Sequence, residues 1–240
     1  MTDTLFHTDC YLQEFEAVVS QVIPEVNAVI LDRTAFFPGG GGQPFDTGTI
    51  ISDNQKIRVS RAKNDSRGLL HILEEGQPLP ESGARVTGRI DWERRYPIMR
   101  THTAMHILCG VIFRDYGALV TGCDMDPLKG HMDFEFESLT GDLIAAIEKS
   151  VNVEVAAARE VRVQILPREE AFQIPDLIRT KINLLPPHIQ QVRTIEIVGL
   201  DLQADGGTHV NNTSEVGPIR ITDYKSKGKI NKRIYVELSA

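Results

Sequence analysis

The chain has 240 residues, of which 41% are apolar and 25% charged, and 26 basic against 33 acidic residues give a net charge of −7. These values are typical of globular proteins and exclude a disordered, collagen-like or membrane composition. The longest apolar runs span only a few residues, as at 28–31, far short of the roughly 20 that cross a bilayer. The N-terminal segment lacks the basic and apolar regions of a secretory signal. We therefore expect a cytoplasmic protein without a membrane partner.

The part of the chain before residue 96 is predicted to form a small all-β domain. Short β-rich runs alternate with turn residues from Ala28 to about Gly88, which is typical of a small barrel or sandwich. The charged segment 90–96 follows, and a helical pattern begins after it. We therefore predict two domains, an N-terminal β-barrel over 1–95 and a second domain over 96–240. The expected strands of the first are 28–37, 49–53, 55–63, 69–73 and 84–91.

The second domain is predicted to mix helices with strands. Between Ile98 and Tyr116, apolar residues at helical spacing predict a helix with one buried stripe, formed by Met105, Leu108, Cys109 and Ile112. Thr140 or Asp142 can cap a second helix, and Pro167 can begin a third. The predicted fold class is therefore α+β, a small N-terminal barrel followed by an α+β domain with an antiparallel sheet. The expected strands of this domain are 118–122, 130–136, 161–166, 189–199, 218–225 and 230–238.

Two polar motifs suggest a metal site. His102 and His106 are four residues apart in the expected helix, which places both imidazoles on one side of it. Near the other end of the chain, a pair of glycines predicts a tight turn that brings Asp205 and His209 together. Imidazole and carboxylate are both ordinary Zn²⁺ ligands. The alternative to a metal site is that the histidines are structural or lie on the surface and that the glycines form a plain turn.

Four motifs occur in order: FFPGGGGQPFDTG (36–48), RTHTAMHIL (100–108), VTG with MDFEF (120–122 and 132–136), and DGGTHV (205–210). With them the whole chain resembles the free-standing alanyl-tRNA editing proteins of the AlaX type and the editing domain of alanyl-tRNA synthetase. In this family, H-x-x-x-H and C-x-x-x-H surround one zinc ion, which implies His102, His106 and His209 as ligands. Asp205 stands where the family pattern most often has cysteine. Either Asp205 is an oxygen ligand, or three histidines hold the metal and water takes the remaining position.

The first of these motifs is a glycine-rich loop. The synthetase pattern has Tyr-Pro-Glu before its glycines, whereas this chain has Phe-Pro-Gly at 37–39. Glycines permit positive φ and a close approach of the backbone to a ligand. The resemblance therefore implies a loop that closes over the editing pocket, whereas the residues alone would also fit a mobile hairpin tip. The pocket-loop residues are Gly40, Gly41, Gly42 and Gln43.

The resemblance implies hydrolysis, in trans, of seryl-tRNA formed in error on the alanine tRNA. A zinc ion would polarise the ester carbonyl or supply hydroxide. Alanine is smaller than serine, so size cannot protect the correct product, and the site must bind the serine hydroxyl. Thr121 resembles in place the family's hydroxyl-recognising residue, although a strand-end threonine with a local backbone bond is the alternative. Thr121 and Asp205 are thus the expected catalytic side chains. The sequence contains no P-loop or Rossmann fingerprint, so no ATP is expected.

The tRNA must also be bound, and one expected hairpin carries five basic residues. Contacts from such residues to phosphates give sequence-independent affinity, whereas a solvated hairpin is the alternative. The predicted tRNA-binding residues are Lys225, Lys227, Lys229, Lys232 and Arg233.

Two other functions fit the same residues. One is a zinc hydrolase of another acyl ester or of a different mischarged tRNA. The other is a catalytically silent tRNA-binding module in which Asp205 marks a degraded metal site. The sequence leaves the tRNA identity, glycine editing and the oligomeric state open.

Overall fold

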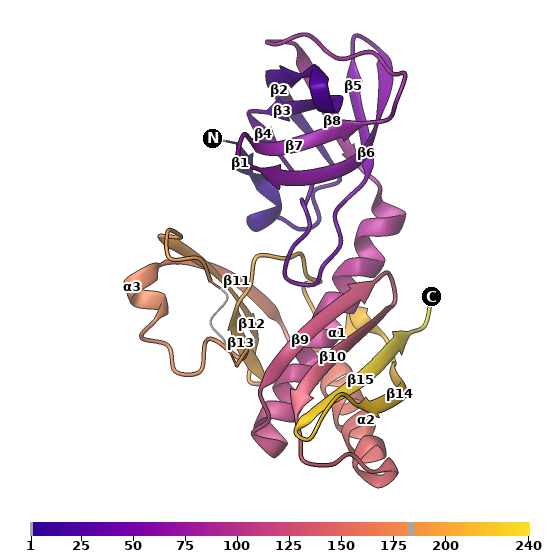
Figure 1. The fold of residues 1–240 in the computed structure, drawn as a ribbon, viewed down its shortest axis with the longest axis vertical. Helices are drawn as coiled ribbons and strands as arrows, with labels where there is room; N and C mark the ends of the chain where they lie inside the picture. The colour runs from indigo at the N-terminus through magenta and orange to yellow at the C-terminus, as the bar shows by residue number, and fades with distance from the viewer. Residues whose placement is uncertain (1, 182–184) are drawn as a thin grey trace. The chain divides into compact units, whose positions relative to one another are not determined.

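The computed structural model describes residues 2–181 and 185–240, and the chain divides into two compact units, Met1–Tyr96 and Pro97–Ala240 (Figure 1). The first unit is a six-stranded antiparallel barrel, and the second combines helices with antiparallel sheets. The predicted fold class is therefore confirmed. Across the described ranges, no helix combines the length and the apolar character needed to span a membrane.

The barrel of the first unit closes in the strand order β2-β3-β7-β6-β5-β8, with every pairing antiparallel. Its strand β2 was not expected from the sequence, because a bulge between Val19 and Gln21 interrupts the alternation of apolar and polar residues. The barrel strands are β2 (Glu14–Ile23), β3 (Ala28–Leu31), β5 (Gly48–Ser52), β6 (Gln55–Asp65), β7 (Gly68–Leu73) and β8 (Arg85–Ile90). Two short strands, β1 (Asp3–Thr4) and β4 (Arg33–Thr34), pair in parallel. Single 3-10 turns follow β1 at Leu5–His7 and join β2 to β3 at Pro24–Val26.

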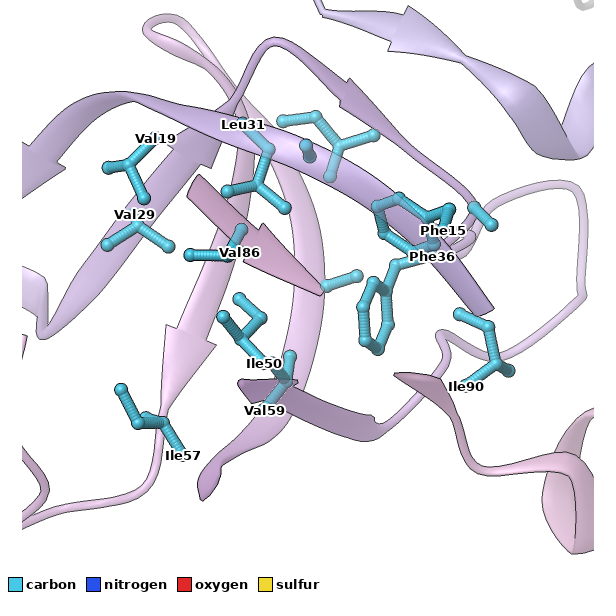
Figure 2. Packing of buried hydrophobic residues seen from close by; sticks show 14 of the residues in the cluster. Phe15, Val19, Val29, Leu31, Phe36, Ile50, Ile57, Val59, Val86 and Ile90 are labelled. Atoms are coloured by element: carbon cyan, nitrogen blue, oxygen red, sulfur yellow. The ribbon is translucent and has the colours of Figure 1, made fainter. Parts of the chain in front are cut away.

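Apolar side chains from all six strands fill the barrel (Figure 2). Phe15 and Phe36 meet edge to face, with ring centroids 5.9 Å apart, a geometry that aromatic pairs prefer. Gly88 makes room for them, because a Cβ at this position would lie 2.4 Å from the Phe15 ring. Each fully buried side chain of this kind contributes roughly 1.5–3 kcal/mol of transfer free energy, so the core accounts for the fold of the first unit.

His71 is a buried polar residue on β7, and its hydrogen bonds define its protonation state. Its Nε2 lies 2.8 Å from Oγ1 of Thr34, which also accepts the N–H of Phe36 at 3.1 Å. Its Nδ1 lies 3.3 Å from the carbonyl oxygen of Val29. A neutral ring satisfies every group in this series of hydrogen bonds, because Nδ1–H donates to the carbonyl of Val29 and Nε2 accepts from the hydroxyl of Thr34. Burial lowers the pKa of His71 to about 4.

The long helix α1 (Trp92–Tyr116) carries the first histidine motif. It begins six residues before the expected start at Ile98, although Pro97 then lies inside it. Contacts of its first turn compensate for the proline: Trp92 stacks on Tyr96 within the helix, with ring centroids 5.5 Å apart, and both rings pack against Tyr11, at 5.8 and 6.4 Å. From residue 98 to 112 almost every side chain is buried. The helix is therefore enclosed on most sides, and its buried surface is wider than the one stripe that the sequence predicted.

The second unit contains two antiparallel sheets. The four-stranded sheet has the order β14-β15-β10-β9 and comprises β9 (Val120–Asp126), β10 (Lys129–Glu135), β14 (Ile219–Ser226) and β15 (Asn231–Leu238). The three-stranded sheet has the order β11-β12-β13 and comprises β11 (Val161–Pro167), β12 (Gln191–Ile197) and β13 (Asp201–Ala204). Thr140 caps α2 (Gly141–Ala156) by accepting the N–H of Leu143 at 3.2 Å, and Pro167 precedes a single turn, α3 (Arg168–Ala171). A further 3-10 turn occupies Thr213–Val216.

Helix α1 contacts both sheets. A Cβ at Gly130 on β10 would lie 3.2 Å from Sδ of Met105. On the β13 side, Gly110 approaches so closely that a Cβ there would lie 2.9 Å from side-chain atoms of both Leu200 and Asp201. The start of β13 is therefore held against the helix one turn beyond His106.

Candidate metal centre

Four side chains from two distant segments meet in the second unit. His102 and His106 project from α1, one turn apart, and both are buried. Asp205 and His209 lie in the loop that follows β13. One ligand atom from each of these residues lies within 4.8 Å of all the others. The structure therefore brings together all four predicted metal-site residues, which the sequence separates by about 100 positions.

The loop that carries Asp205 and His209 is fixed by hydrogen bonds. Oδ1 of Asp205 accepts the N–H of Gly207 at 2.6 Å, which makes the glycine pair a tight turn. The buried Arg193 donates from Nη1 to the carbonyl oxygens of Asp205 and Gly207, at 3.0 and 2.8 Å. The N–H of Val210 donates to Oγ1 of Thr103 on α1 at 3.2 Å. The loop is thus attached to the helix that supplies the other two side chains.

Asp205 lies between the three imidazoles. Its Oδ2 is 3.5 Å from Nε2 of His102 and 3.9 Å from Nε2 of His106, and its Oδ1 is 3.9 Å from Nε2 of His209. Ligands of one tetrahedral zinc ion, each about 2.0–2.1 Å from the metal, stand ~3.3 Å apart. These three Asp–His separations are wider than that, and the four ligand atoms as a set lie within 4.8 Å of one another, so the side chains would shift inward to complete such a site. Asp205 is also the most solvent-accessible member, with 18% of its side chain exposed.

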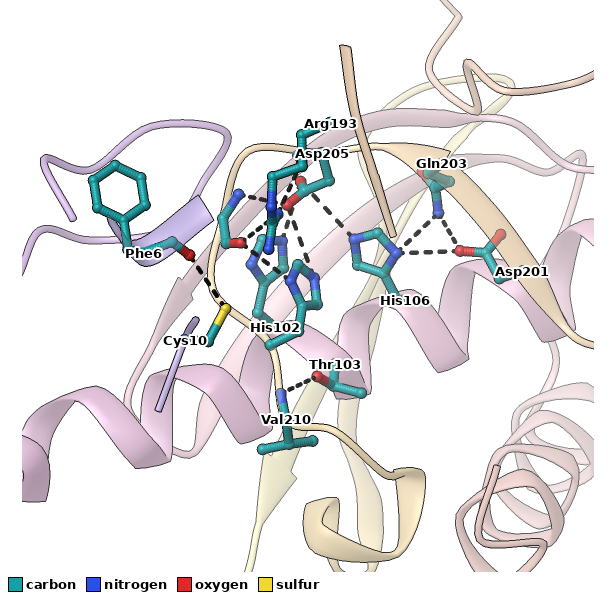
Figure 3. Close-up of polar contacts among 12 residues, drawn as sticks. Phe6, Cys10, His102, Thr103, His106, Arg193, Asp201, Gln203, Asp205 and Val210 are labelled. Carbon is teal, nitrogen blue, oxygen red and sulfur yellow. Dashed lines mark hydrogen bonds and ion pairs between the residues drawn. The ribbon is translucent and has the colours of Figure 1, made fainter. Parts of the chain in front are cut away.

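The second nitrogens of two rings already have partners, which leaves Nε2 for a metal (Figure 3). Nδ1 of His106 lies 3.2 Å from Oδ2 of Asp201, and Nδ1 of His209 lies 3.3 Å from the carbonyl oxygen of Gly207. Nε2 of His209 is buried and has no hydrogen-bond partner among the described residues. A buried nitrogen without a partner is costly, and a cation bound there would satisfy it. The donor set therefore fits Zn²⁺.

The charges of the cluster also favour a cation. Burial alone would raise the pKa of Asp205, but the neighbouring imidazoles, His102 first, hold it well below its ordinary value. Burial opposes protonation of His106, yet its hydrogen bonds to Asp201 and Asp205 raise its pKa to about 9. Burial and the neighbouring imidazoles lower the pKa of His209 well below its ordinary value. The partly exposed carboxylate of Asp205 is thus compensated by a positive charge, which a metal ion can supply as well as a proton.

Sequence reasoning did not find the side chains that support the cluster. Asp201 is completely buried, and Gln203 donates to its Oδ2 at 2.6 Å. Residues 201, 203 and 205 alternate along one strand and its extension, so their polar side chains share one face. That alternation in the sequence could have indicated that Asp201 and Gln203 lie on the same face as Asp205. The other partner of Asp201 is Arg179, which lies in an irregular segment without a recognisable pattern.

The structure places Thr121 on the surface of the second unit. It stands at the bulge where β9 leaves its register with β10, and its Oγ1 donates to Oδ1 of Asn231 on β15 at 2.8 Å. The hydroxyl oxygen keeps lone pairs that can accept a further hydrogen bond. Its expected recognition of serine stays a prediction.

The five basic residues of the predicted hairpin have different environments. Lys232 is buried and donates to the carbonyl oxygens of residues 228 and 229. Arg233 pairs with Asp133 through two hydrogen bonds of 2.6 and 2.8 Å. The exposed members are Lys225, Lys227 and Lys229. The hairpin therefore presents three lysines to solvent, fewer than the sequence suggested.

The glycine-rich loop belongs to the first unit and is closed at both ends. Its four consecutive glycines all have positive φ, between 60° and 142°, a region that favours glycine. Gly40 and Gln43 exchange two backbone hydrogen bonds of 3.0 Å at the tip. At the base, Oδ2 of Asp46 accepts the N–H of Phe37 at 2.6 Å, and Asp46 forms a buried ion pair with Arg95. The loop is thus a defined turn on a rigid base, and its closure over a pocket stays a prediction.

Comparison with known proteins assigns the chain to a family. Residues 6–94 match the family model for class II (A) tRNA synthetases, and residues 192–235 match the second additional domain of threonyl and alanyl tRNA synthetases. The chain is 40% identical to the alanyl-tRNA editing protein AlaX-M of Saccharolobus solfataricus, over 98% of both chains. It is 37% identical to the AlaX-M protein of Methanosarcina acetivorans, over 99% of both. It is also 38% identical to the alanine–tRNA ligase of Ignicoccus hospitalis, over 92% of this chain but 24% of the ligase.

These matches place the two-unit chain with its His/Asp cluster in the synthetase-related editing class. The chain belongs to the AlaX-M family of alanyl-tRNA editing proteins.

Proposed function

We propose that this protein is a zinc-dependent deacylase that removes serine, in trans, from mischarged alanine tRNA. The observation that carries the proposal is the cluster of three imidazoles and one carboxylate within 4.8 Å of one another. The relatives named as editing proteins support it, because they match over nearly their whole length, whereas the ligase matches over about a quarter.

The residues of the cluster have separate roles in this proposal. His102, His106 and His209 hold the ion through Nε2, and Asp205 is the fourth ligand. When bound, a zinc ion is a Lewis acid that can polarise an ester carbonyl or lower the pKa of a water molecule bound to it. Catalytic zinc sites keep one position open. Asp205 is the most exposed of the four and opens the turn, so its carboxylate is the ligand nearest to solvent and would border the position that a substrate needs.

Selection of serine and binding of RNA involve residues outside the cluster. A site that must prefer serine over alanine gains from a hydrogen bond to the hydroxyl, and Thr121 is our candidate for that contact. The exposed amines of Lys225, Lys227 and Lys229 are candidates for contacts to tRNA phosphates. Such contacts give affinity without reading sequence. In this proposal the identity of the tRNA is read elsewhere.

The test combines metal analysis with deacylation assays. The wild-type protein should contain about one zinc per chain and hydrolyse seryl-tRNA faster than alanyl-tRNA. The double variant His102→Ala/His106→Ala should lose both the metal and the activity. The matched control is His188→Ala, which removes an exposed histidine of the same unit and should change neither. Equal metal content in the wild type and the double variant would show that the site is assigned wrongly.

A further inference from the structure

A fifth side chain, Asp201, contacts the cluster without being one of its candidate ligands. It begins β13, and its carboxylate is completely buried. Its Oδ2 lies 3.2 Å from Nδ1 of His106, whereas Nε2 of the same ring faces Asp205 at 3.9 Å (Figure 3). The imidazole of His106 is therefore held between two carboxylates, one on each ring nitrogen.

Two other side chains hold the carboxylate of Asp201 in place. Gln203 donates from Nε2 to Oδ2 at 2.6 Å, and Arg179 donates from Nε to Oδ1 at 3.4 Å. The guanidinium of Arg179 lies over the ring of Phe113 on α1, 3.7 Å from its centroid, which fixes its plane by a cation–π contact. Both carboxylate oxygens are thus engaged. Asp201 cannot turn away from His106 without losing an ion pair and a hydrogen bond.

The packing of the backbone brings Asp201 close to α1. Gly110 lies four residues after His106 and therefore on the same side of α1. A Cβ at Gly110 would lie 2.9 Å from Cβ of Asp201. The helix and the strand approach each other so closely that the carboxylate reaches the ring directly, without an intervening water.

Nδ1 of His106 has two neighbours, Oδ2 of Asp201 at 3.2 Å and the amide Nε2 of Gln203 at 3.5 Å. The amide already donates to Oδ2 of Asp201 at 2.6 Å, and the carboxylate can only accept, so the closer contact favours a neutral His106 ring with its proton on Nδ1. Nε2 then keeps its lone pair, and the ring cannot flip without breaking the bond. We propose that Asp201, held by Arg179, is the positioning residue that fixes the tautomer and orientation of His106 for metal binding. Metal affinity then depends on two side chains that never touch the ion. The inference rests on the metal site in the proposed function.

The test measures the affinity of the full chain for Co²⁺ in competition with a chelator. Asp201→Asn preserves size but offers an amide that can donate to Nδ1, which favours the wrong tautomer. Loss of such a partner typically weakens metal binding about 10- to 100-fold, and we expect this loss here. Arg179→Met leaves the carboxylate in place but frees it to move, so a measurable loss, smaller than that of Asp201→Asn, is expected. Asp124→Asn, at an exposed carboxylate on β9, is the control and should bind as the wild type does.

Two further readouts separate positioning from a general structural role. Thermal unfolding of the metal-free variants reports stability, and the visible absorption bands of bound Co²⁺ report the geometry of its ligands. Positioning by Asp201 predicts shifted bands and weaker binding even where the unfolding temperature is unchanged. If Asp201→Asn and Arg179→Met both bind Co²⁺ as tightly as the wild type and only unfold at lower temperatures, the positioning role of Asp201 is wrong. The proposed function would not be affected by that result. A wild-type protein that binds no Co²⁺ would overturn the metal site and the proposed function with it.

Discussion

Lowering the pH should weaken the β-barrel through His71, and replacing this residue with glutamine should remove that effect. The neutral ring completes a chain of hydrogen bonds from Phe36 through Thr34 to the carbonyl oxygen of Val29. A second proton on the ring would turn Nε2 from an acceptor into a donor. The hydroxyl proton of Thr34 would then lose its acceptor. Protonation therefore opposes folding in addition to its cost in desolvation.

The magnitude follows from the pKa of His71, which burial lowers from 6.5 to about 4. The unfolded chain takes up a proton near pH 6.5, whereas the folded barrel does so only near pH 4. Between these values the unfolded state binds more protons, so the free energy of unfolding falls as the pH falls. A difference of about 2.5 units at about 1.36 kcal/mol each corresponds to a total loss of ~3 kcal/mol. Above pH 7.5 His71 should contribute no pH dependence.

Urea unfolding followed by tryptophan fluorescence can measure this loss. The single tryptophan, Trp92, packs against Tyr11 and Tyr96 within the first unit and therefore reports on it. Between pH 7.5 and 4.5 the wild type should lose about 2–3 kcal/mol relative to His71→Gln, because all other titrating groups are shared. Parallel pH profiles for the two proteins would refute the reasoning and show that folded His71 accepts a proton readily.

Two predictions concern the site itself. Asp205→Ala should weaken zinc binding in a chelator titration, whereas Asp205→Cys should keep or tighten it, because thiolate is a strong zinc ligand; equal affinity in all three proteins would leave a site of three histidines. Thr121→Val should lower seryl-tRNA hydrolysis about 5- to 150-fold while the alanyl-tRNA rate changes little, since a lost hydrogen bond to the serine hydroxyl costs roughly 1–3 kcal/mol. Single-turnover deacylation of both substrates checks this, and an equal loss on both would assign Thr121 a structural role through its bond to Asn231.

The sequence predicted the parts of the fold and site that depend on local periodicity. The spacing of His102 and His106 placed both rings on one side of a helix, and the glycine turn placed Asp205 beside His209. The structure brings the four residues together. Only the resemblance to a known family joined the two motifs, because no local pattern indicates which distant segments meet in a fold.

Features that depend on tertiary contacts were predicted less well. Helix α1 begins before Pro97 because the ring of Tyr11 and a buried ion pair with Asp46 stabilise its first turn. Arg179 reaches Asp201 from a segment without regular structure. The burial of Lys232, however, could have been predicted from the sequence, because this residue alternates with Ile234 and Val236 on the inward face of β15. Its amine donates to two backbone carbonyls at the end of the hairpin, and its predicted contact with tRNA stays a prediction.

The aspartate at position 205 has a consequence for chemical durability. None of the four clustered side chains contains sulfur, whereas the family pattern places a cysteine there, and peroxide oxidises zinc-binding thiolates to species that no longer hold the metal. The nearby Cys123 and Cys109 are protected in another way, because burial raises the pKa of Cys123 to about 12 and that of Cys109 well above its ordinary value. Both therefore stay as thiols, the poorly reactive form. If the proposed metal site is occupied, its occupancy should accordingly be insensitive to oxidants that would damage a cysteine ligand.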